Sequence, residues 1–243
     1  MPDLFDAAIA SALGIAVLNG LIQGYTGFGG ALLMVPLVSV LFSPLEAVPM
    51  VGFAMLFGSA QLYPPAIRMA VWRDLIPIFA GITIFTPLGA FLLFYLDPQL
   101  IRRAMGGFIL VFALILMSGW VYRGRRGLLP SVSVGGLSGV ITGASGVGGP
   151  PVALYFLASP HPVEIQRANI VVGVTFLTIA VLASIAAGGG ISMDIVVRGL
   201  LLTPAYVLGV WSGARLFEAM PKSYFRRAAL WLLVVTGLGI LIL

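Results

Sequence analysis

The residues best suited to chemistry in this sequence are glycines that interrupt two apolar runs. The first group lies in GYTGFGG, residues 24–30, within a stretch that has no charged residue from Ala7 to Leu45; the second lies in GASGVGG, residues 143–149. Glycine lets a ligand approach the backbone closely. The free amides and positive dipole end of a helix N-terminus bind anions without a charged side chain. The two segments therefore predict an anion site built from backbone amides.

Polar side chains near these glycines are candidates for further hydrogen bonds to the anion. Gln23 and Tyr25 border the first break, and Arg167 is the best charged candidate for attracting or holding the anion. Two alternatives stay open, because serine and threonine in membrane helices often bond to backbone or to a neighbouring helix, and an interfacial arginine often snorkels. The predicted substrate-binding residues are Gln23, Tyr25, Thr26, Gly27, Phe28, Gly29, Gly30, Thr142, Ser145, Gly146, Val147, Gly148, Gly149, Arg167 and Asn169.

Four other glycines are expected to have a different role. Gly20 and Gly24, like Gly139 and Gly143, form small-xxx-small patterns, which normally serve close packing between membrane helices. Packing alone does not need three glycines in four residues, as found at each break. We therefore expect the four to pack helices and the glycines of the breaks to lie near a ligand.

The sequence does not indicate an enzyme. It has no cysteine, and its single histidine, His161, stands between two prolines in an expected loop and is predicted to have no special role. No residues have metal-ligand spacing, and no Ser, His and Asp set is placed for nucleophilic catalysis. GFGG lacks the lysine of a phosphate-binding loop. We predict no catalytic residues, no metal and no cofactor.

The composition is that of an integral membrane protein. Of 243 residues, 60% are hydrophobic and 9% charged, against roughly 25% charged in soluble domains. The net charge of +5 is spread between apolar runs, which favours loop charges that orient the chain over a nucleic-acid face. The acidic start MPDLFD lacks the cations of a signal peptide, so we expect no cleaved signal.

Two of the charge-free runs are too long for one membrane crossing. They cover residues 7–45 and 127–160 and would extend about 58 and 51 Å as straight helices, whereas the hydrocarbon core is about 30 Å thick. Three runs of single-span length follow each. We expect each long run to fold back at its glycines as a helical hairpin, re-entrant or spanning. Its second helix should begin near Phe28 to Gly30 in the first run and near Gly148 to Pro151 in the second.

The two halves of the chain are repeats. Five glycines of the first half recur in the second at a constant displacement of 119 residues, which predicts a tandem duplication of the kind found in transporters. The repeats cover residues 1–122 and 127–243 and together form one transport domain. The paired positions are Gly20 and Gly139, Gly24 and Gly143, Gly27 and Gly146, Gly29 and Gly148, and Gly30 and Gly149.

Loop charges distinguish two topologies. If each long run crosses once, Arg and Lys divide seven against six between the two sides; if each folds back, they divide ten against three, as the positive-inside rule expects. The second topology predicts inverted repeats with both termini facing away from the cytoplasm. Its cytoplasmic cations are Arg68, Arg73, Arg123, Arg125, Arg126, Arg167, Arg215, Lys222, Arg226 and Arg227.

The paired motifs GLIQGYTGFGGALLMVPLV and GLSGVITGASGVGGPPVALYF open the two halves, and with them the chain resembles the TauE/SafE sulfite exporter family. The span pattern extends the resemblance over essentially the whole chain. Ala31 and Pro150 stand where the family motif commonly continues with a third glycine. The resemblance implies transport of sulfite, sulfoacetate or related organosulfur anions across the inner membrane.

We therefore predict an all-α polytopic membrane protein with about eight to ten helical membrane elements, in which each repeat is a glycine-broken hairpin followed by three transmembrane helices. The predicted function is a secondary transporter that exports a small anion from bacterial cells by alternating access. An anion channel with the same site and a membrane-embedded enzyme are the alternatives; the interior lacks paired carboxylates for the latter. The predicted partners are the anion and the lipid bilayer, without nucleic acid, and a homodimer is left open.

Overall fold

The computed structural model describes residues 7–26, 29–119, 122, 124, 127–219, 231, 234 and 238. Among the predicted binding residues, Gly27 and Phe28 lie outside these ranges, and so does the side chain of Thr26. The predicted cytoplasmic cations that lie outside them are Arg123, Arg125, Arg126, Lys222, Arg226 and Arg227.

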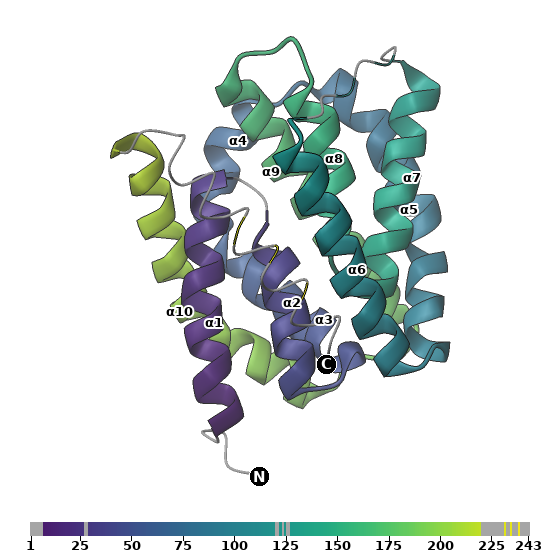
Figure 1. Cartoon of the computed structure of the whole chain (residues 1–243), viewed down its shortest axis with the longest axis vertical. Coiled ribbons are helices and arrows are strands. Elements are labelled where there is room, and N and C mark those ends of the chain that lie inside the picture. The colour runs from purple at the N-terminus through teal and green to yellow at the C-terminus, as the bar shows by residue number, and fades with distance from the viewer. Residues whose placement is uncertain are drawn as a thin grey trace.

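All the regular elements of the described residues are helices, as predicted (Figure 1). Those of the first repeat are α1 (Ala7–Thr26), α2 (Gly30–Leu41), α3 (Pro44–Gly58), the short 3₁₀ helix η1 (Ala60–Leu62), α4 (Tyr63–Met69), α5 (Trp72–Tyr95) and α6 (Pro98–Met117). Those of the second are α7 (Leu128–Ser145), α8 (Gly149–Leu157), α9 (Val163–Ala187) and α10 (Met193–Ala219).

Each long apolar run is a hairpin with one short arm. The second arms, α2 and α8, have 12 and 9 residues and are therefore about 18 and 14 Å long, too short to cross the bilayer. Three longer elements follow the first hairpin: α3 with α4, bent by 46°, then α5 and α6. Two described helices, α9 and α10, follow the second hairpin, and the third expected there falls in 220–243, largely outside the described residues.

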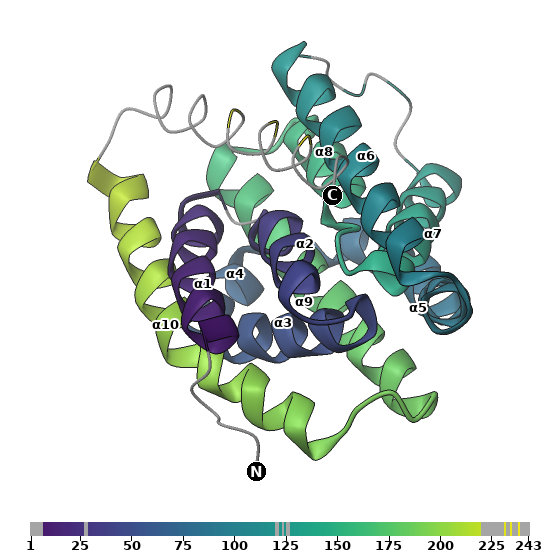
Figure 2. The same cartoon turned by 60° about the horizontal axis from the view of Figure 1, so that its bottom comes forward.

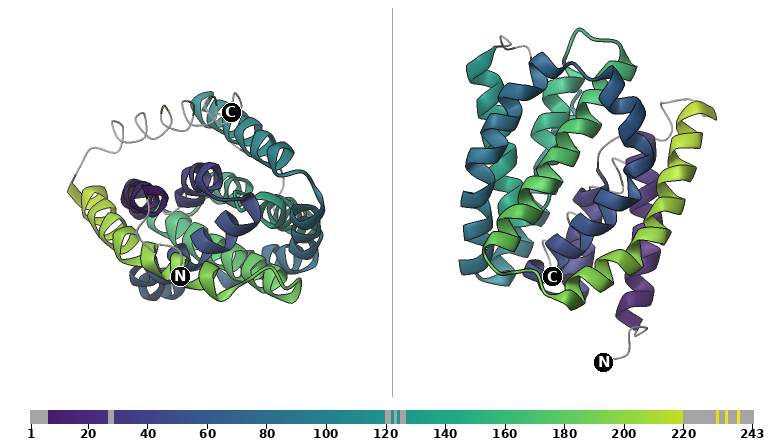
Figure 3. Two further views of the ribbon diagram at one scale, coloured as in Figure 1. Left: turned by 90° about the horizontal axis from the view of Figure 1, so that it is seen from below. Right: turned by 180° about the vertical axis from the view of Figure 1, so that it is seen from behind.

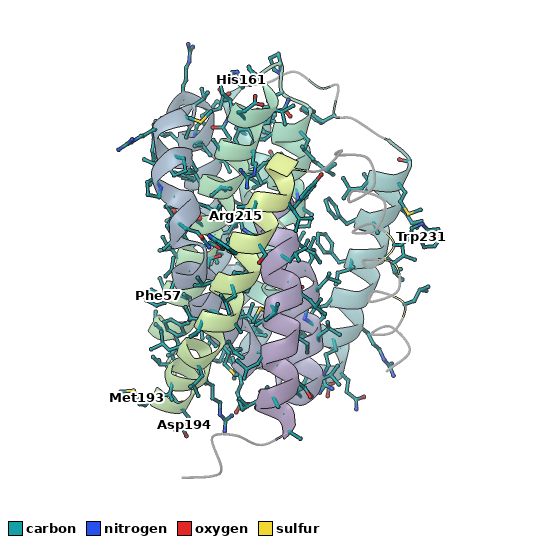
Figure 4. All side chains as sticks on the ribbon, turned by 90° about the vertical axis from the view of Figure 1, so that its left-hand side faces the viewer. Phe57, His161, Met193, Asp194, Arg215 and Trp231 are labelled. Carbon is teal, nitrogen blue, oxygen red and sulfur yellow. The ribbon has the colours of Figure 1, made fainter. Side chains whose placement is uncertain are left out.

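The outer surface of this bundle suits a membrane. Six described helices are long and apolar enough to cross a bilayer, or up to seven if the bent pair α3 and α4 counts as one span. Large apolar side chains also lie exposed on the outside, among them Phe57 at 51% and Met193 at 76% (Figure 4). This exposure is stable where the surrounding solvent is lipid.

The most extensive helix contacts join the two repeats: α1 packs along α10, and α7 packs along α5 (Figure 2). Glycines allow both close approaches. A β-carbon on Gly20 would lie 3.0 Å from the Val210 amide nitrogen, and one on Gly143 would lie 2.6 Å from that of Ala90. Gly24 and Gly139 make equivalent contacts. The four glycines expected to pack helices do so.

The helices of each pair run in the same direction, since Gly135 approaches Ile78 and Gly143 approaches Ala90 farther along both α7 and α5. The pair α1 and α10 shows the same order of contacts. The two pairs run oppositely: α5 starts where Asp74 meets His161, at the top of Figure 4, whereas α10 starts at Met193, at the bottom. Thus α1 and α7 are antiparallel, as an inverted repeat requires.

The described cations agree with the hairpin topology. Because α5 and α9 start at the end marked by His161, and α4 and α10 finish toward it, cations there belong to the predicted cytoplasmic side. The helices α2, α3 and α9 lie between the pair α1 and α10 and the pair α5 and α7, in the middle of the molecule (Figure 3). Toward the His161 end lie Arg68, Arg73, Arg167 and Arg215, and toward the opposite end lie Arg102, Arg103 and Arg198.

Replacing a glycine at the contact between α7 and α5 tests this packing. We expect Gly143→Ala to lower the stability of the detergent-solubilised protein by roughly 1–3 kcal/mol, because the added methyl group collides with the backbone of α5. Gly107→Ala is the matched control: it also lies within a helix, and a β-carbon there meets nothing within 4 Å. Size-exclusion profiles after graded heating measure the difference, and equal midpoints for both variants would contradict the packing role.

Candidate anion-binding site

The two helix breaks meet at one internal cavity. Its walls come from α2 and α3 of the first repeat and from α7, α8 and α9 of the second. Gly29 precedes α2, and Gly149 is the first residue of α8, so the starts of both short helices reach the cavity. The lining residues are Gly29, Ala31, Leu32, Val35, Val48, Val51, Gly52, Met55, Thr142, Gly146, Val147, Gly149, Pro150, Val174, Leu177, Thr178 and Val181.

At the first break, Gly29 takes a left-handed conformation with φ of 96°, which an L side chain rarely adopts, and α2 begins at Gly30. The Gly30 amide donates a 3.1 Å hydrogen bond to the side-chain oxygen of Gln23. Gln23 thus satisfies one of the amides that a helix N-terminus leaves open. Its carboxamide oxygen acts here as an acceptor for the backbone.

At the second break, α7 ends where the Gly146 amide donates a 2.7 Å hydrogen bond to the Thr142 carbonyl. Gly146 is also left-handed, with φ of 72°. Gly148 then precedes α8, whose first turn holds Pro150, as the preference for proline at helix starts predicts. Both short helices therefore begin where the sequence indicated.

One polar side chain reaches the cavity with an unused hydrogen. Thr142 lines the cavity, is 4% exposed, and its hydroxyl forms no hydrogen bond. The nearby Ser138 hydroxyl is also buried and unbonded. Because buried polar groups are normally hydrogen-bonded, these two hydroxyls are candidates for bonding to a ligand or a water.

Several predicted binding residues lie elsewhere. The Arg167 Nη2 donates a 2.5 Å hydrogen bond to the Gly24 carbonyl at the end of α1, and the Asn169 oxygen accepts one of 2.7 Å from the Val71 amide before α5. The Ser145 hydroxyl donates to the Ile141 carbonyl within its own helix. None of these three, nor the buried Tyr25, is among the lining residues.

Sequence reasoning missed Tyr206. This residue of α10 is completely buried, and its hydroxyl lies beside the start of α2, next to Gly30. A signal was available: a tyrosine in the middle of the apolar run 199–214 buries a polar atom that normally needs a partner. His161 was expected to be unspecialised, yet its ring nitrogen lies 3.1 Å from an Asp74 carboxylate oxygen and links the two repeats.

The chemical character of the cavity is apolar with a few donors. None of the described residues lining it is charged, and positive potential can come from the two helix starts. Its volume is about 30 Å³, room for a water molecule or two. The described residues contain no group of three or more His, Cys, Asp or Glu that could hold a metal ion.

Comparison with known proteins identifies the family of the chain. The family model described as "Sulfite exporter TauE/SafE" matches residues 12–240, nearly the whole chain. The chain belongs to the TauE/SafE family. A TauE/SafE protein with several apolar helices is a multi-pass bacterial membrane protein that takes part in transport, and the resemblance seen in the paired glycine motifs is confirmed.

A curated relative of the TauE/SafE chain carries a more specific name. The "Probable sulfite/organosulfonate exporter TauE" of Cupriavidus necator is 27% identical over 227 residues, covering 90% of this chain and 88% of the relative. No solved structure matches the chain.

Gly148 and Gly149, at the second break, differ in how much space their surroundings leave for a side chain. A β-carbon on Gly148 would lie 2.5 Å from the Thr142 amide nitrogen, whereas one on Gly149 meets only a Val174 methyl group at 3.4 Å. We expect Gly148→Ala to lower the yield of folded protein severely, because the α7 backbone cannot yield, and Gly149→Ala to fold normally. Monodisperse yield in detergent measures both, and a well-folded Gly148→Ala protein would refute the assigned contact.

Proposed function

We propose that this protein is a secondary transporter that exports sulfite or a small organosulfonate across the bacterial inner membrane. The observation that supports this most directly is the cavity shared by the starts of α2 and α8, which is lined by Thr142, a residue whose hydroxyl is unbonded. The name of the Cupriavidus necator relative supports the same substrate class.

The proposed binding mode uses backbone amides in place of cationic side chains. A Lys or Arg at the centre of the bilayer is costly, whereas helix N-termini supply positive potential from the fold itself, as at the broken helices of other transporters. Within the site, Gly29, Gly146 and Gly149 allow close approach of the oxyanion, and Thr142 donates a hydrogen bond to it. Gly27 and Phe28, between Gly29 and the end of α1, belong to the same proposed site.

Arg167 has a supporting role in this proposal. Its guanidinium holds the carbonyl end of α1 through Gly24, and a cation there favours the negative end of the helix dipole. It thereby connects α9 of the second repeat to the break of the first. We propose that Arg167 positions the first break and adds to the positive potential that draws an anion inward.

Transport by this site requires movement. A cavity of about 30 Å³ is too small for an organosulfonate, so binding at this site requires the surrounding helices to move apart. We propose that the molecule opens alternately to the two sides by rocking one group of helices against another, with inverted repeats supplying two related conformations. We also propose that the end of the molecule that carries His161 faces the cytoplasm.

Removing the Thr142 hydroxyl tests the site. In proteoliposomes loaded with the purified protein, we expect Thr142→Val to raise the KM for radiolabelled sulfite about tenfold or more, since a hydrogen bond to a charged group contributes roughly 1.5–3 kcal/mol. Thr142→Ser should retain most of the affinity. Thr203→Val is the matched control, because that hydroxyl bonds to the Gly199 carbonyl away from the cavity. An unchanged KM in Thr142→Val would exclude this residue from the site.

A second measurement distinguishes a carrier from a channel with the same site. Proteoliposomes preloaded with unlabelled sulfite are diluted into labelled sulfite, and uptake is followed over time. A carrier that alternates between two closed-off states should show transient accumulation above equilibrium by counterflow, while a channel should not. Absence of any saturable flux for sulfite, sulfoacetate or taurine would contradict the proposed function as a whole.

A further inference from the structure

Glycines on three other helices make space for Tyr206. A β-carbon on Gly58 of α3 would lie 2.5 Å from the Tyr206 ring, one on Gly20 of α1 would lie 2.5 Å from its carbonyl oxygen, and one on Gly30 of α2 would collide with its hydroxyl. Three glycines from three helices thus accommodate one tyrosine, which is completely buried. The fold places this side chain with little freedom to move.

The hydroxyl at the end of this side chain forms no hydrogen bond. The Ser59 hydroxyl, at the bend between α3 and α4, interacts with the Tyr206 hydroxyl, but the two do not reach the geometry of a full hydrogen bond. A buried hydroxyl without a partner is destabilising. The Tyr206 hydroxyl, beside the start of α2, is therefore a donor that an incoming ligand can use.

The neighbouring backbone identifies the kind of molecule. The Gly30 amide donates a 3.1 Å hydrogen bond to the Gln23 side-chain oxygen. The first turn of α2 therefore already binds one acceptor oxygen, that of Gln23. An oxyanion presents the same lone pairs with more negative charge, and the positive end of the helix dipole favours it over a neutral amide. The Tyr206 and Ser59 hydroxyls can each donate a hydrogen bond, and an oxyanion accepts such bonds.

Resting on the proposed function, we propose that Tyr206 is a substrate-binding residue at a second subsite, on the face of the α2 start that points away from the central cavity. Here the transported oxyanion accepts hydrogen bonds from the Tyr206 hydroxyl and the Gly30 amide, and the Gln23 side chain swings aside to release that amide. Gly29 and Ala31 line the central cavity, whereas neither Gly30 nor Tyr206 does. The proposed subsite is therefore next to the central cavity and separate from it.

The test compares two single variants, in each of which one tyrosine loses only its hydroxyl. For Tyr206→Phe we expect the stabilisation of the detergent-solubilised protein by sodium sulfite to weaken and the KM for sulfite to rise about tenfold, with kcat within twofold. The stability without sulfite should stay equal or increase, because an unbonded buried hydroxyl is removed. Tyr155→Phe is the control, since that hydroxyl bonds to Ser131 at 2.9 Å, and its sulfite response should match the wild type.

A second variant examines the exchange with Gln23. Gln23→Met keeps the side-chain length without the oxygen, so the Gly30 amide no longer has to be released, and we expect the KM for sulfite to fall severalfold. A sulfite response of Tyr206→Phe equal to that of the wild type would overturn the role of Tyr206, and a raised KM in Gln23→Met would overturn the exchange. A wild-type protein that neither binds nor transports any of these anions would instead overturn the proposed function itself.

Discussion

The rest of the structure depends on one constraint: a helix broken inside hydrocarbon exposes backbone groups that lipid cannot satisfy. The chain breaks twice, after α1 and after α7, and partners are present at both places. The Gly30 amide bonds to Gln23, the Gly24 carbonyl bonds to Arg167, and the Gly146 amide bonds to the Thr142 carbonyl. Two of these partners lie on the same hairpin, and the third comes from the opposite repeat.

That constraint also bears on how the helices of the two halves of the chain pack together. A short arm such as α2 or α8 cannot be stable alone in lipid, so each hairpin needs a long helix against it. The short arms α2 and α8 lie against α3 and α9, while the long arms α1 and α7 pack on α10 and α5 through glycines that bring two backbones into contact. The cavity lies between α2 and α3 of the first half of the chain and α7, α8 and α9 of the second.

The sequence predicted the local features of the site better than its contacts. The helix starts at Gly30 and Gly149 follow from backbone preferences of glycine and proline, which act over a few residues. The surroundings of Asn169 and Tyr206 could not be predicted, because they come from segments about 100 or more residues away. Periodicity and spacing contain no information about which distant helix a given side chain meets.

By itself, the sequence determined that the chain is an all-helical membrane protein with two similar halves, two broken apolar runs and a cationic side, since hydropathy, run length and charge act locally along the chain. Only the tertiary structure decided that α10 places Tyr206 at the start of α2, that Arg167 caps α1, and that both breaks share one cavity. These outcomes depend on which helix faces allow the closest packing in three dimensions, and close packing is a property of the assembled bundle.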